Sequence, residues 1–382
     1  MNLYELIDQG NFHRNSGEPD TALKYYAQAF VQDHTCAPAF NNYGNVLREM
    51  GHPRRAIPFL EHAHELDPGS VTAEFNLAVA YLLAGDYQKG WEFYESRWRY
   101  EHLAGTKPKL PQPEWQGEPL KDKTILVIGE QGLGDQIQFA RFLYELSAQG
   151  AAIKLHVSEP LKSLFNHDNK RMLQVTSGND DIGDFDYWIP IMSLPRVLGI
   201  TLQNLRPELH YIQADPEKIK IWAQRLGHKR KTRIGFAWSG RRDSWINQHK
   251  AMPLAHMIQL IQSSPEHEWI SLQVDADAAD QQQLESLART FPGSVQNMSD
   301  TAGLLHHLDL VITVDTAVAH LSGAMGRPTW IPLNLYGNCW RWGVERSDCA
   351  WYPSARLFRQ AQYGDWDEVI NKITQYLSWF KV

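Results

Sequence analysis

The chain of 382 residues is poor in cysteine, in basic charge and in long apolar runs. It has three cysteines, and neither Cys339 nor Cys349 has CxxC spacing or a nearby histidine. This pattern is typical of a reducing compartment and gives no reason to expect a metal site. No apolar run is long enough to cross a bilayer, and the first residues lack the basic and apolar regions of a signal peptide. We therefore expect a cytoplasmic protein without a transmembrane segment.

The charge balance excludes another class. Lysine and arginine number 37 against 44 acidic residues, which gives a formal net charge of −7. A protein that binds nucleic acid neutralises phosphates with a basic surface, so we expect no nucleic-acid partner. At this length, two or three domains are the natural expectation.

The first hundred residues repeat with a period of 34. Small residues recur in register at positions where two helices would approach each other: Gly10, Gly44 and Ala78, then Ala22, Ala56 and Gly90. A further glycine, expected to end the first helix of each pair, recurs at Gly17, Gly51 and Gly85. The pattern resembles the tetratricopeptide repeat family over three units, of which Ala37 to Ser70 is the clearest. The third unit departs at Arg97, where a small residue is usual, so its second helix is expected to adapt to its neighbours.

Such an array stacks into a short solenoid with a concave face. Two interpretations stay open: the face binds a protein or peptide partner, or the repeats brace the following domain. We assign residues 1–104 to the array and 105–122 to a proline-rich linker, in which Trp115 is expected to pin the chain to a neighbouring surface.

From Lys123 the pattern changes to strands that alternate with helices, which predicts α/β architecture. We expect strands at 124–128, 153–157, 173–175, 187–191, 233–238, 269–274, 310–314 and 329–333. We expect helices at 135–149, 161–165, 216–226, 254–262, 278–291 and 366–379. These elements predict two Rossmann-type halves, at 123–212 and 213–362, with ligands bound where the parallel strands end. Residues 363–382 are expected to form a helix that packs back on the first half.

The strongest site signal is a buried strand that runs directly into a helix after Asp315. Asp315 and Thr316 suit the start of a helix, and small residues such as Ala317 follow. A helix that begins in a crevice directs backbone N–H groups and a positive dipole end at its contents, which suits a phosphate group. His320 lies in the first turns of this helix, and both a donor contact and a buried core role stay open for it.

A glycine-rich turn precedes the expected helix at 135–149. Gly132 and Gly134 lack the third glycine of a dinucleotide fingerprint, so NAD binding is disfavoured. If Asp135 only capped the helix, the aspartate would be explained but the glycines would not. A close approach of the backbone to a ligand explains both. We predict Asp135 as the base that deprotonates an acceptor hydroxyl, with Gly132, Gly134 and Gln136 on the acceptor side.

Further candidates follow the strands of the second half. Ser239, Gly240, Arg241 and Lys250 come after the strand at 233–238, and we favour anion binding there over a merely solvated loop. Gln273 ends the next strand and is a candidate for contacts with a base or ribose. Late aromatic residues are expected to pack between domains, with Trp342 kept as a candidate for stacking on a ligand.

The residues from Asp315 to Pro328 resemble the donor-site motif of bacterial glycosyltransferase family 9, the ADP-heptose:lipopolysaccharide heptosyltransferases. Gly134-Asp135 and Lys250-Ala251-Met252-Pro253 are similar to two further motifs of that family, with Met252 where tryptophan is usual. The resemblance implies a GT-B fold, a base at Asp135 and a cation at Lys250 that neutralises donor phosphate. The fused repeats are not part of a heptosyltransferase, and they also resemble the arrangement of O-linked N-acetylglucosamine transferases.

These signals predict an α-helical repeat solenoid followed by a GT-B-like pair of α/β domains. The function that we expect is an inverting, metal-independent glycosyltransferase that takes a nucleotide-diphosphate sugar as co-substrate, without any other cofactor. Its acceptor would be a glycan or a protein. The alternative is a non-catalytic scaffold in which a degenerate GT-B body carries interacting repeats.

Overall fold

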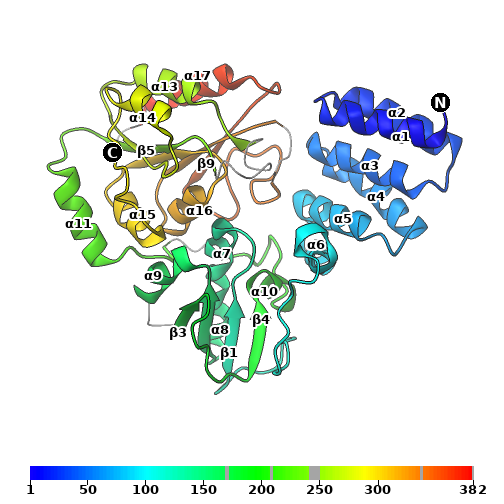
Figure 1. Ribbon diagram of the computed structural model, residues 1–382, viewed down its shortest axis with the longest axis horizontal. Helices are drawn as coiled ribbons and strands as arrows, with labels where there is room; N and C mark the ends of the chain where they lie inside the picture. The colour runs from blue at the N-terminus through cyan, green and yellow to red at the C-terminus, as the bar shows by residue number, and fades with distance from the viewer. Residues whose placement is uncertain (168–171, 207–209, 241–249, 336–338, 381–382) are drawn as a thin grey trace. The chain divides into compact units, whose positions relative to one another are not determined.

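The computed structural model describes residues 1–167, 172–206, 210–240, 250–335 and 339–380 (Figure 1). The chain packs into two compact units. The first contains Met1–Lys109, Leu198–Leu205 and Leu335–Arg346. The second contains Leu110–Val197, Arg206–Asn334 and Ser347–Val382, and it holds both α/β halves.

The first unit contains three helical pairs, as the period of 34 predicts. They are α1 (Leu3–Asn15) with α2 (Pro19–Gln32), α3 (Ala37–Glu49) with α4 (Pro53–Leu66), and α5 (Val71–Ala84) with α6 (Tyr87–Tyr94). The glycines between the helices of each pair have φ values of 76°, 83° and 88°, a conformation that other residues rarely adopt. A Cβ atom at Gly44 would lie 2.7 Å from Leu60, so the small residue is required by close packing of the pair.

The second helix of the third pair is short and ends at Tyr94, three residues before Arg97, the position that departs from the repeat pattern. After α6 the chain continues in two 3₁₀ segments, Glu95–Arg99 and Glu101–Leu103. The Arg97 side chain is fully buried and pairs with Glu95 at 2.7 Å. A buried guanidinium needs more room and more polar partners than a small residue, and the 3₁₀ segment around Arg97 replaces the regular helix there.

The first α/β half contains a four-stranded parallel sheet of order β3-β2-β1-β4. Its strands are β1 (Thr124–Ile128), β2 (Ala152–Val157), β3 (Met172–Ser177) and β4 (Tyr187–Pro190). The linker joins the edge of this sheet, where the Trp115 N–H donates to the Trp188 carbonyl at 2.8 Å. The Trp115 side chain is buried, so the expected pinning of the linker is confirmed.

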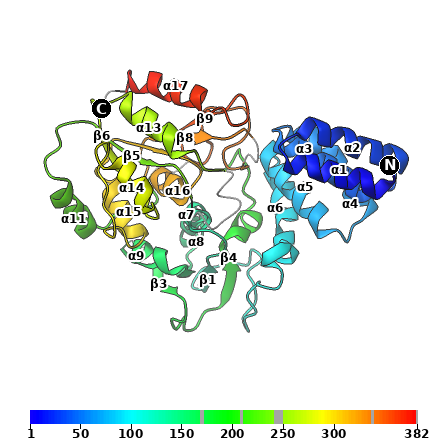
Figure 2. The ribbon, with the colours of Figure 1, turned by 45° about the horizontal axis from the view of Figure 1, so that its top comes forward.

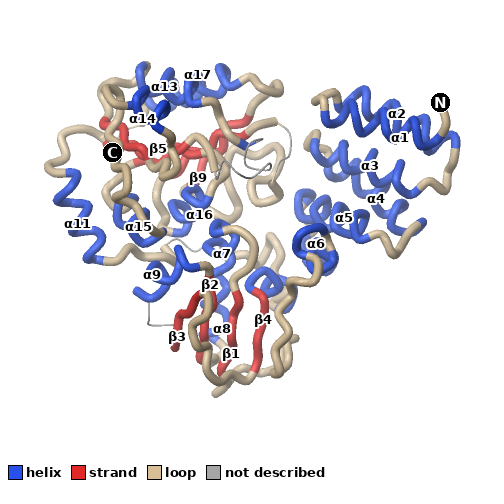
Figure 3. The backbone as a smooth tube through the Cα atoms, in the orientation of Figure 1, coloured by secondary structure: helices blue, strands red, loops and turns tan. Residues whose placement is uncertain are grey.

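The second half contains a five-stranded parallel sheet of order β6-β5-β7-β8-β9. Its strands are drawn in red in Figure 3, where β5 and β9 are labelled. Its strands are β5 (Arg233–Ala237), β6 (Glu268–Ser271), β7 (Leu310–Thr313), β8 (Thr329–Leu333) and β9 (Ala355–Arg359). Strands β5, β7 and β8 are buried along their whole length, as expected for central parallel strands that helices cover on both faces.

The helices of the second unit connect these strands. They are α7 (Leu133–Phe139), α8 (Leu143–Ala148), α9 (Glu159–His167), α10 (Leu194–Val197), α11 (Pro216–Leu226), α13 (Leu254–Gln262), α14 (Ala278–Leu284), α15 (Met298–Leu305), α16 (Ala317–Ala324) and α17 (Trp366–Leu377). Short 3₁₀ segments lie at Ala140–Phe142 and Ile191–Ser193.

Two expected helices depart furthest from the prediction. The helix predicted at 135–149 is interrupted by the 3₁₀ segment at Ala140–Phe142, which separates α7 from α8. The helix predicted at 278–291 ends at Leu284. The chain beyond it bridges to β6, where Arg289 pairs with Glu268 at 2.6 Å and draws the backbone out of the helix.

The predicted return of the C-terminal helix to the first half is wrong. Helix α17 packs against α13 and β9 of the second half, and Figure 2 shows α17 beside α13. Its buried side chains, Val369, Ile370 and Ile373 among them, belong to the same apolar core as β5 and β7. The apolar side of α17 therefore packs on the second half and completes its core.

Candidate active site

The candidate site lies where β5, β6 and β7 end and where α16 begins. Asp315 follows β7, Ser239 follows β5 and Gln273 follows β6. Parallel strands bring their carboxyl ends to one edge of the sheet, so these residues meet although they are far apart in sequence. The Gln273 carboxamide oxygen accepts hydrogen bonds from the backbone N–H of Trp238 at 3.3 Å and of Ser239 at 3.2 Å.

This contact changes the role expected of Gln273. Its amide nitrogen also donates to the Ser239 hydroxyl at 3.1 Å and to Asp275 at 2.5 Å. Gln273 thus holds the end of β5 in place by bonding the backbone of the predicted anion loop. Gly240 is half-buried next to this contact, and Arg241 lies outside the described residues.

Lys250 and Asp315 form the main charged pair of the site. Their side chains are joined at 2.6 Å, and the carboxylate is 8% exposed against 25% for the ammonium group. The sequence separates the two residues by 65 positions, and the fold brings both predicted donor residues together. A lysine ammonium has three N–H donors, so Lys250 can hold Asp315 and still bind an anion.

Helix α16 begins at the same place. Thr316 is its N-cap residue, and within the described part of the chain no side chain caps the helix. The Thr316 hydroxyl lies 3.0 Å from that of Thr313, and both Thr316 and Ala317 are half-buried. The first amide groups of the helix can therefore serve an anion with the support of the helix dipole.

His320 occupies the buried side of α16, so the core interpretation of this residue is the one that the structure supports. Its side chain is 6% exposed, Nδ1 lies 2.9 Å from the Tyr352 hydroxyl, and Nε2 lies 3.8 Å from a carboxylate oxygen of Asp315. The sequence carries no signal for Tyr352 as a polar partner, because this residue lies in an aromatic stretch whose expected role is packing.

The glycine-rich turn of the first half contacts α16 directly. A Cβ atom at Gly134 would lie 2.6 Å from the His320 ring, so only glycine allows this approach. Helices α7 and α16 lie side by side in Figures 1 and 2. Asp135 follows Gly134, is half-buried, and accepts a hydrogen bond from the Gly132 N–H at 2.9 Å. The predicted base therefore lies beside the predicted donor motif.

Two predicted site residues need correction. Gln136 is 1% exposed, and its side chain bonds Ser158, with the amide nitrogen 2.8 Å from the hydroxyl. Its side chain supports the glycine-rich turn from inside the first half and does not point to the surface where the acceptor substrate was expected. Trp342 is also 1% exposed and belongs to the unit that contains the repeats, so its ring has no free face for stacking on a ligand.

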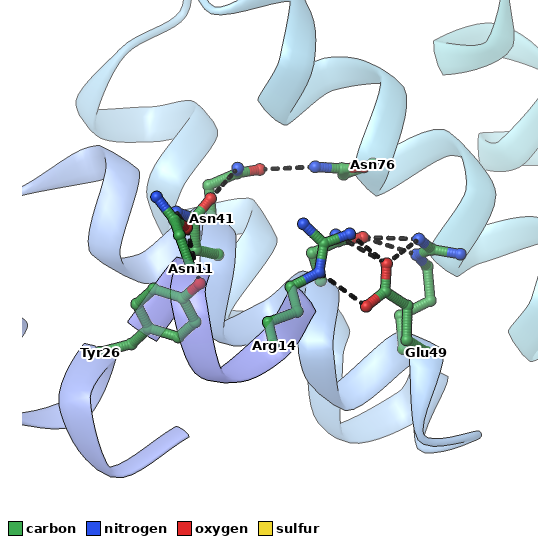
Figure 4. Close-up of polar contacts among 9 residues, drawn as sticks. Asn11, Arg14, Tyr26, Asn41, Glu49 and Asn76 are labelled. Atoms are coloured by element: carbon green, nitrogen blue, oxygen red, sulfur yellow. Dashed lines mark hydrogen bonds and ion pairs between the residues drawn. The ribbon is translucent and has the colours of Figure 1, made fainter. Parts of the chain in front are cut away.

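A series of hydrogen-bonded polar side chains, here called the polar ladder, extends over all three tetratricopeptide-like repeats (Figure 4). Asn76 donates to Asn41 at 3.0 Å, and Asn42 donates to Asn11 at 3.1 Å, which also accepts from Tyr26. Arg14 pairs with Glu49 at 2.5 Å beside Arg48. Because Asn41 and Asn76 are buried and bonded to each other, this ladder ties the repeats together.

Comparisons with known proteins agree with this architecture. The profile "Glycosyltransferase family 9 (heptosyltransferase)" matches residues 296–340, which include α16, and the profile "Tetratricopeptide repeat" matches residues 37–70, the unit predicted as clearest. ADP-heptose lipopolysaccharide heptosyltransferase II of E. coli has the same fold: TM-score 0.52 at 14% identity, over 67% of this chain and 97% of that one. The chain is therefore similar to tetratricopeptide repeats over residues 37–70 and to glycosyltransferase family 9 over residues 296–340, and its α/β part has the fold of that family's heptosyltransferase structures.

Two further relatives extend the comparison. The family 9 glycosyl transferase of Veillonella parvula gives a TM-score of 0.52 at 14% identity, over 70% of this chain and 92% of that structure. Protein FlbA of Caulobacter vibrioides is 24% identical over 395 residues, which cover 95% of this chain. The match spans 65% of the length of FlbA.

Among the described residues, none of the helices is both long and apolar enough to cross a bilayer. The same residues hold no group of three or more histidine, cysteine or acidic side chains arranged to bind a metal ion.

Proposed function

We propose that the protein is an inverting, metal-independent glycosyltransferase whose donor is a nucleotide-diphosphate sugar and whose acceptor is a glycan or a protein. The observation that carries this proposal is the meeting of Gly134-Asp135 with the start of α16 beside the Lys250–Asp315 pair. A base and a diphosphate site must be neighbours if an acceptor oxygen is to attack the sugar carbon that the diphosphate leaves.

In the proposed reaction, the Asp135 carboxylate takes the proton of the acceptor hydroxyl. The acceptor oxygen bonds to the anomeric carbon of the sugar as the bond between that carbon and the diphosphate oxygen breaks. The charge that develops on the leaving diphosphate is stabilised by the first amides of α16 and by Lys250. Asp315 holds Lys250 in place, and no other cofactor is needed for these steps.

The repeats would supply a partner surface to this enzyme. Tetratricopeptide arrays have a concave face that suits a peptide, and such a peptide could belong to a protein acceptor. The polar ladder of Figure 4 joins the repeats to one another, which is compatible both with a partner surface and with repeats that brace the following domain. The cysteine pattern leads us to propose a cytoplasmic setting.

Titration calorimetry with a panel of nucleoside diphosphates tests the donor proposal. We expect the full chain to bind at least one of ADP, UDP, GDP and CDP with a dissociation constant in the micromolar range, roughly −8 kcal/mol. Nucleoside monophosphates should bind more weakly, because the amides of α16 and Lys250 are proposed to contact the diphosphate. If no diphosphate releases heat or raises the melting temperature, the protein is the non-catalytic scaffold instead.

A further inference from the structure

A line of buried polar groups connects the donor motif to an aromatic cluster in the second unit. It begins at Asp315, whose carboxylate faces Nε2 of His320 at 3.8 Å. It continues from Nδ1 of His320 to the Tyr352 hydroxyl at 2.9 Å. Tyr352 is fully buried, so its hydroxyl forms hydrogen bonds with other groups of the protein interior and not with bulk solvent. No step of the proposed reaction uses Tyr352.

The chemistry of the three groups favours one arrangement of their protons. A carboxylate oxygen only accepts, and the negative charge of Asp315 at 3.8 Å favours the tautomer of His320 that carries the ring proton on Nε2. In the neutral ring, Nδ1 is then an acceptor for the Tyr352 hydroxyl. Burial raises the pKa of Tyr352 well above its ordinary value, so the hydroxyl keeps its proton and remains a donor. Tyr211 is a second hydrogen-bond partner of this hydroxyl, and a Tyr352 proton directed at Nδ1 favours the tautomer of His320 with its proton on Nε2.

Close packing holds both rings at these positions. A Cβ atom at Gly323 would lie 2.5 Å from the Tyr352 ring, and one at Gly134 would lie 2.6 Å from the His320 ring. Two glycines thus leave space for the two rings and nothing larger. Because the His320 ring lies against Gly134, its orientation determines where the following residue, Asp135, is held.

Arg141 braces the far end of the line. It lies in the 3₁₀ segment that follows α7 and donates to the Trp351 carbonyl at 2.6 Å. Its guanidinium carbon is 5.1 Å from the centre of the Trp351 ring and 5.3 Å from that of Tyr352. Within the described part of the chain, Nε and Nη1 of this buried arginine have no hydrogen-bond partner, so the aromatic faces are its main contacts. These contacts tie the first half to the tyrosine.

We propose that Tyr352 is a positioning residue for glycosyl transfer. Its hydroxyl fixes the His320 ring, and the ring in turn holds Asp315 toward Lys250 and the Asp135 turn against α16. This role rests on the proposed function, since it concerns the placing of the base and the donor site. The tyrosine touches neither the donor nor the acceptor.

The test compares Tyr352→Phe with a matched control, Tyr376→Phe. Tyr376 lies on α17, away from the line, and accepts a hydrogen bond from Arg356 at 2.8 Å. We expect Tyr352→Phe to lower kcat about tenfold with KM for the donor within about threefold, and the control to leave both unchanged. A drop of similar size in both variants would overturn the proposal, because it would show a general loss of stability.

A second readout does not depend on transfer. In the full chain with ¹⁵N-labelled histidine, the signals of His320 are identified by their loss in His320→Gln. We expect the ring nitrogens to report Nε2 protonated and Nδ1 accepting a hydrogen bond, and Tyr352→Phe to shift the Nδ1 signal. Unchanged His320 signals in Tyr352→Phe would overturn the positioning role. If no nucleotide sugar supports transfer, the proposed function fails while this readout still decides on the hydrogen bond.

The double variant gives a further check. The hydroxyl is proposed to act only through the histidine, so Tyr352→Phe should add less than about twofold to the loss in kcat caused by His320→Gln. Fully multiplicative losses would mean that the two side chains act independently, and would contradict the proposal. If Tyr352→Phe has a melting temperature far below that of the control, its kcat no longer tests the proposal. His320→Gln alone must then still lower kcat, and an unchanged kcat in that variant would contradict the proposal.

Discussion

Asp135→Asn should reduce glycosyl transfer roughly 10³-fold while nucleoside diphosphate binding stays within about twofold of the parent protein. Asparagine has the shape of aspartate, and its carboxamide oxygen can still accept the hydrogen bond from the Gly132 N–H. The glycine-rich turn would therefore keep its geometry, and only the basic oxygen would be lost. The measurement is the rate of nucleoside diphosphate release with donor and acceptor present, together with calorimetric binding of the diphosphate.

The matched control is Asp184→Asn, an exposed aspartate in the same half of the second unit. It should change neither the rate nor the binding. Loss of binding together with transfer in Asp135→Asn would assign Asp135 a structural role, and full retention of transfer would remove it as the base.

The second large effect is expected at Lys250. Lys250→Ala should weaken nucleoside diphosphate binding about 30-fold or more, because it removes a cation from the site and leaves the Asp315 carboxylate beside the bound phosphates. Asp315 is only 8% exposed, so its carboxylate would remain in the site and repel the incoming phosphates. Calorimetric titration of the variant with the best nucleoside diphosphate measures the change.

Two further variants separate charge from folding. Lys372→Ala removes a lysine from an exposed pair with Glu368 on α17 and should leave binding unchanged. Adding Asp315→Asn to Lys250→Ala should recover part of the lost affinity, since the repelling charge is gone. No recovery, or equal binding by Lys250→Ala and the parent protein, would exclude the proposed electrostatic role of the pair.

Local sequence patterns were sufficient for much of the architecture. Helices α11 and α13 begin and end where the sequence predicts, because proline and the Asp215 cap mark the start of α11 and apolar spacing marks the faces of both. The central strands β1 and β8 are likewise continuous apolar runs. The period of 34 predicted the repeats, since each unit must present small residues at its helix contacts.

Long-range packing explains what the sequence did not predict. Strand β9 carries two arginines within five residues, a composition more typical of a loop, and it becomes a strand by pairing with β8. Helix α17 has an apolar stripe that could cover either half, and only the shape of the second core decides between them. The contact between His320 and Tyr352 joins residues 32 positions apart and leaves no local pattern.

The candidate site shows the same division. The sequence identified Asp135, Lys250 and Asp315 by motif, but not that Lys250 and Asp315 pair with each other. It also assigned Gln136 to the acceptor side, because position in a glycine-rich turn does not tell which way a side chain points. Burial of Gln136 against Ser158 is a property of the folded sheet edge.

The central claim is that a diphosphate binds at the start of α16. The most direct measurement is a crystal structure of the full chain with the nucleoside diphosphate that binds best in the titration. The account predicts phosphate oxygens within hydrogen-bond distance of the first amides after Thr316 and of the Lys250 ammonium group. A diphosphate bound elsewhere, with the Lys250–Asp315 pair and the start of α16 untouched, would contradict it.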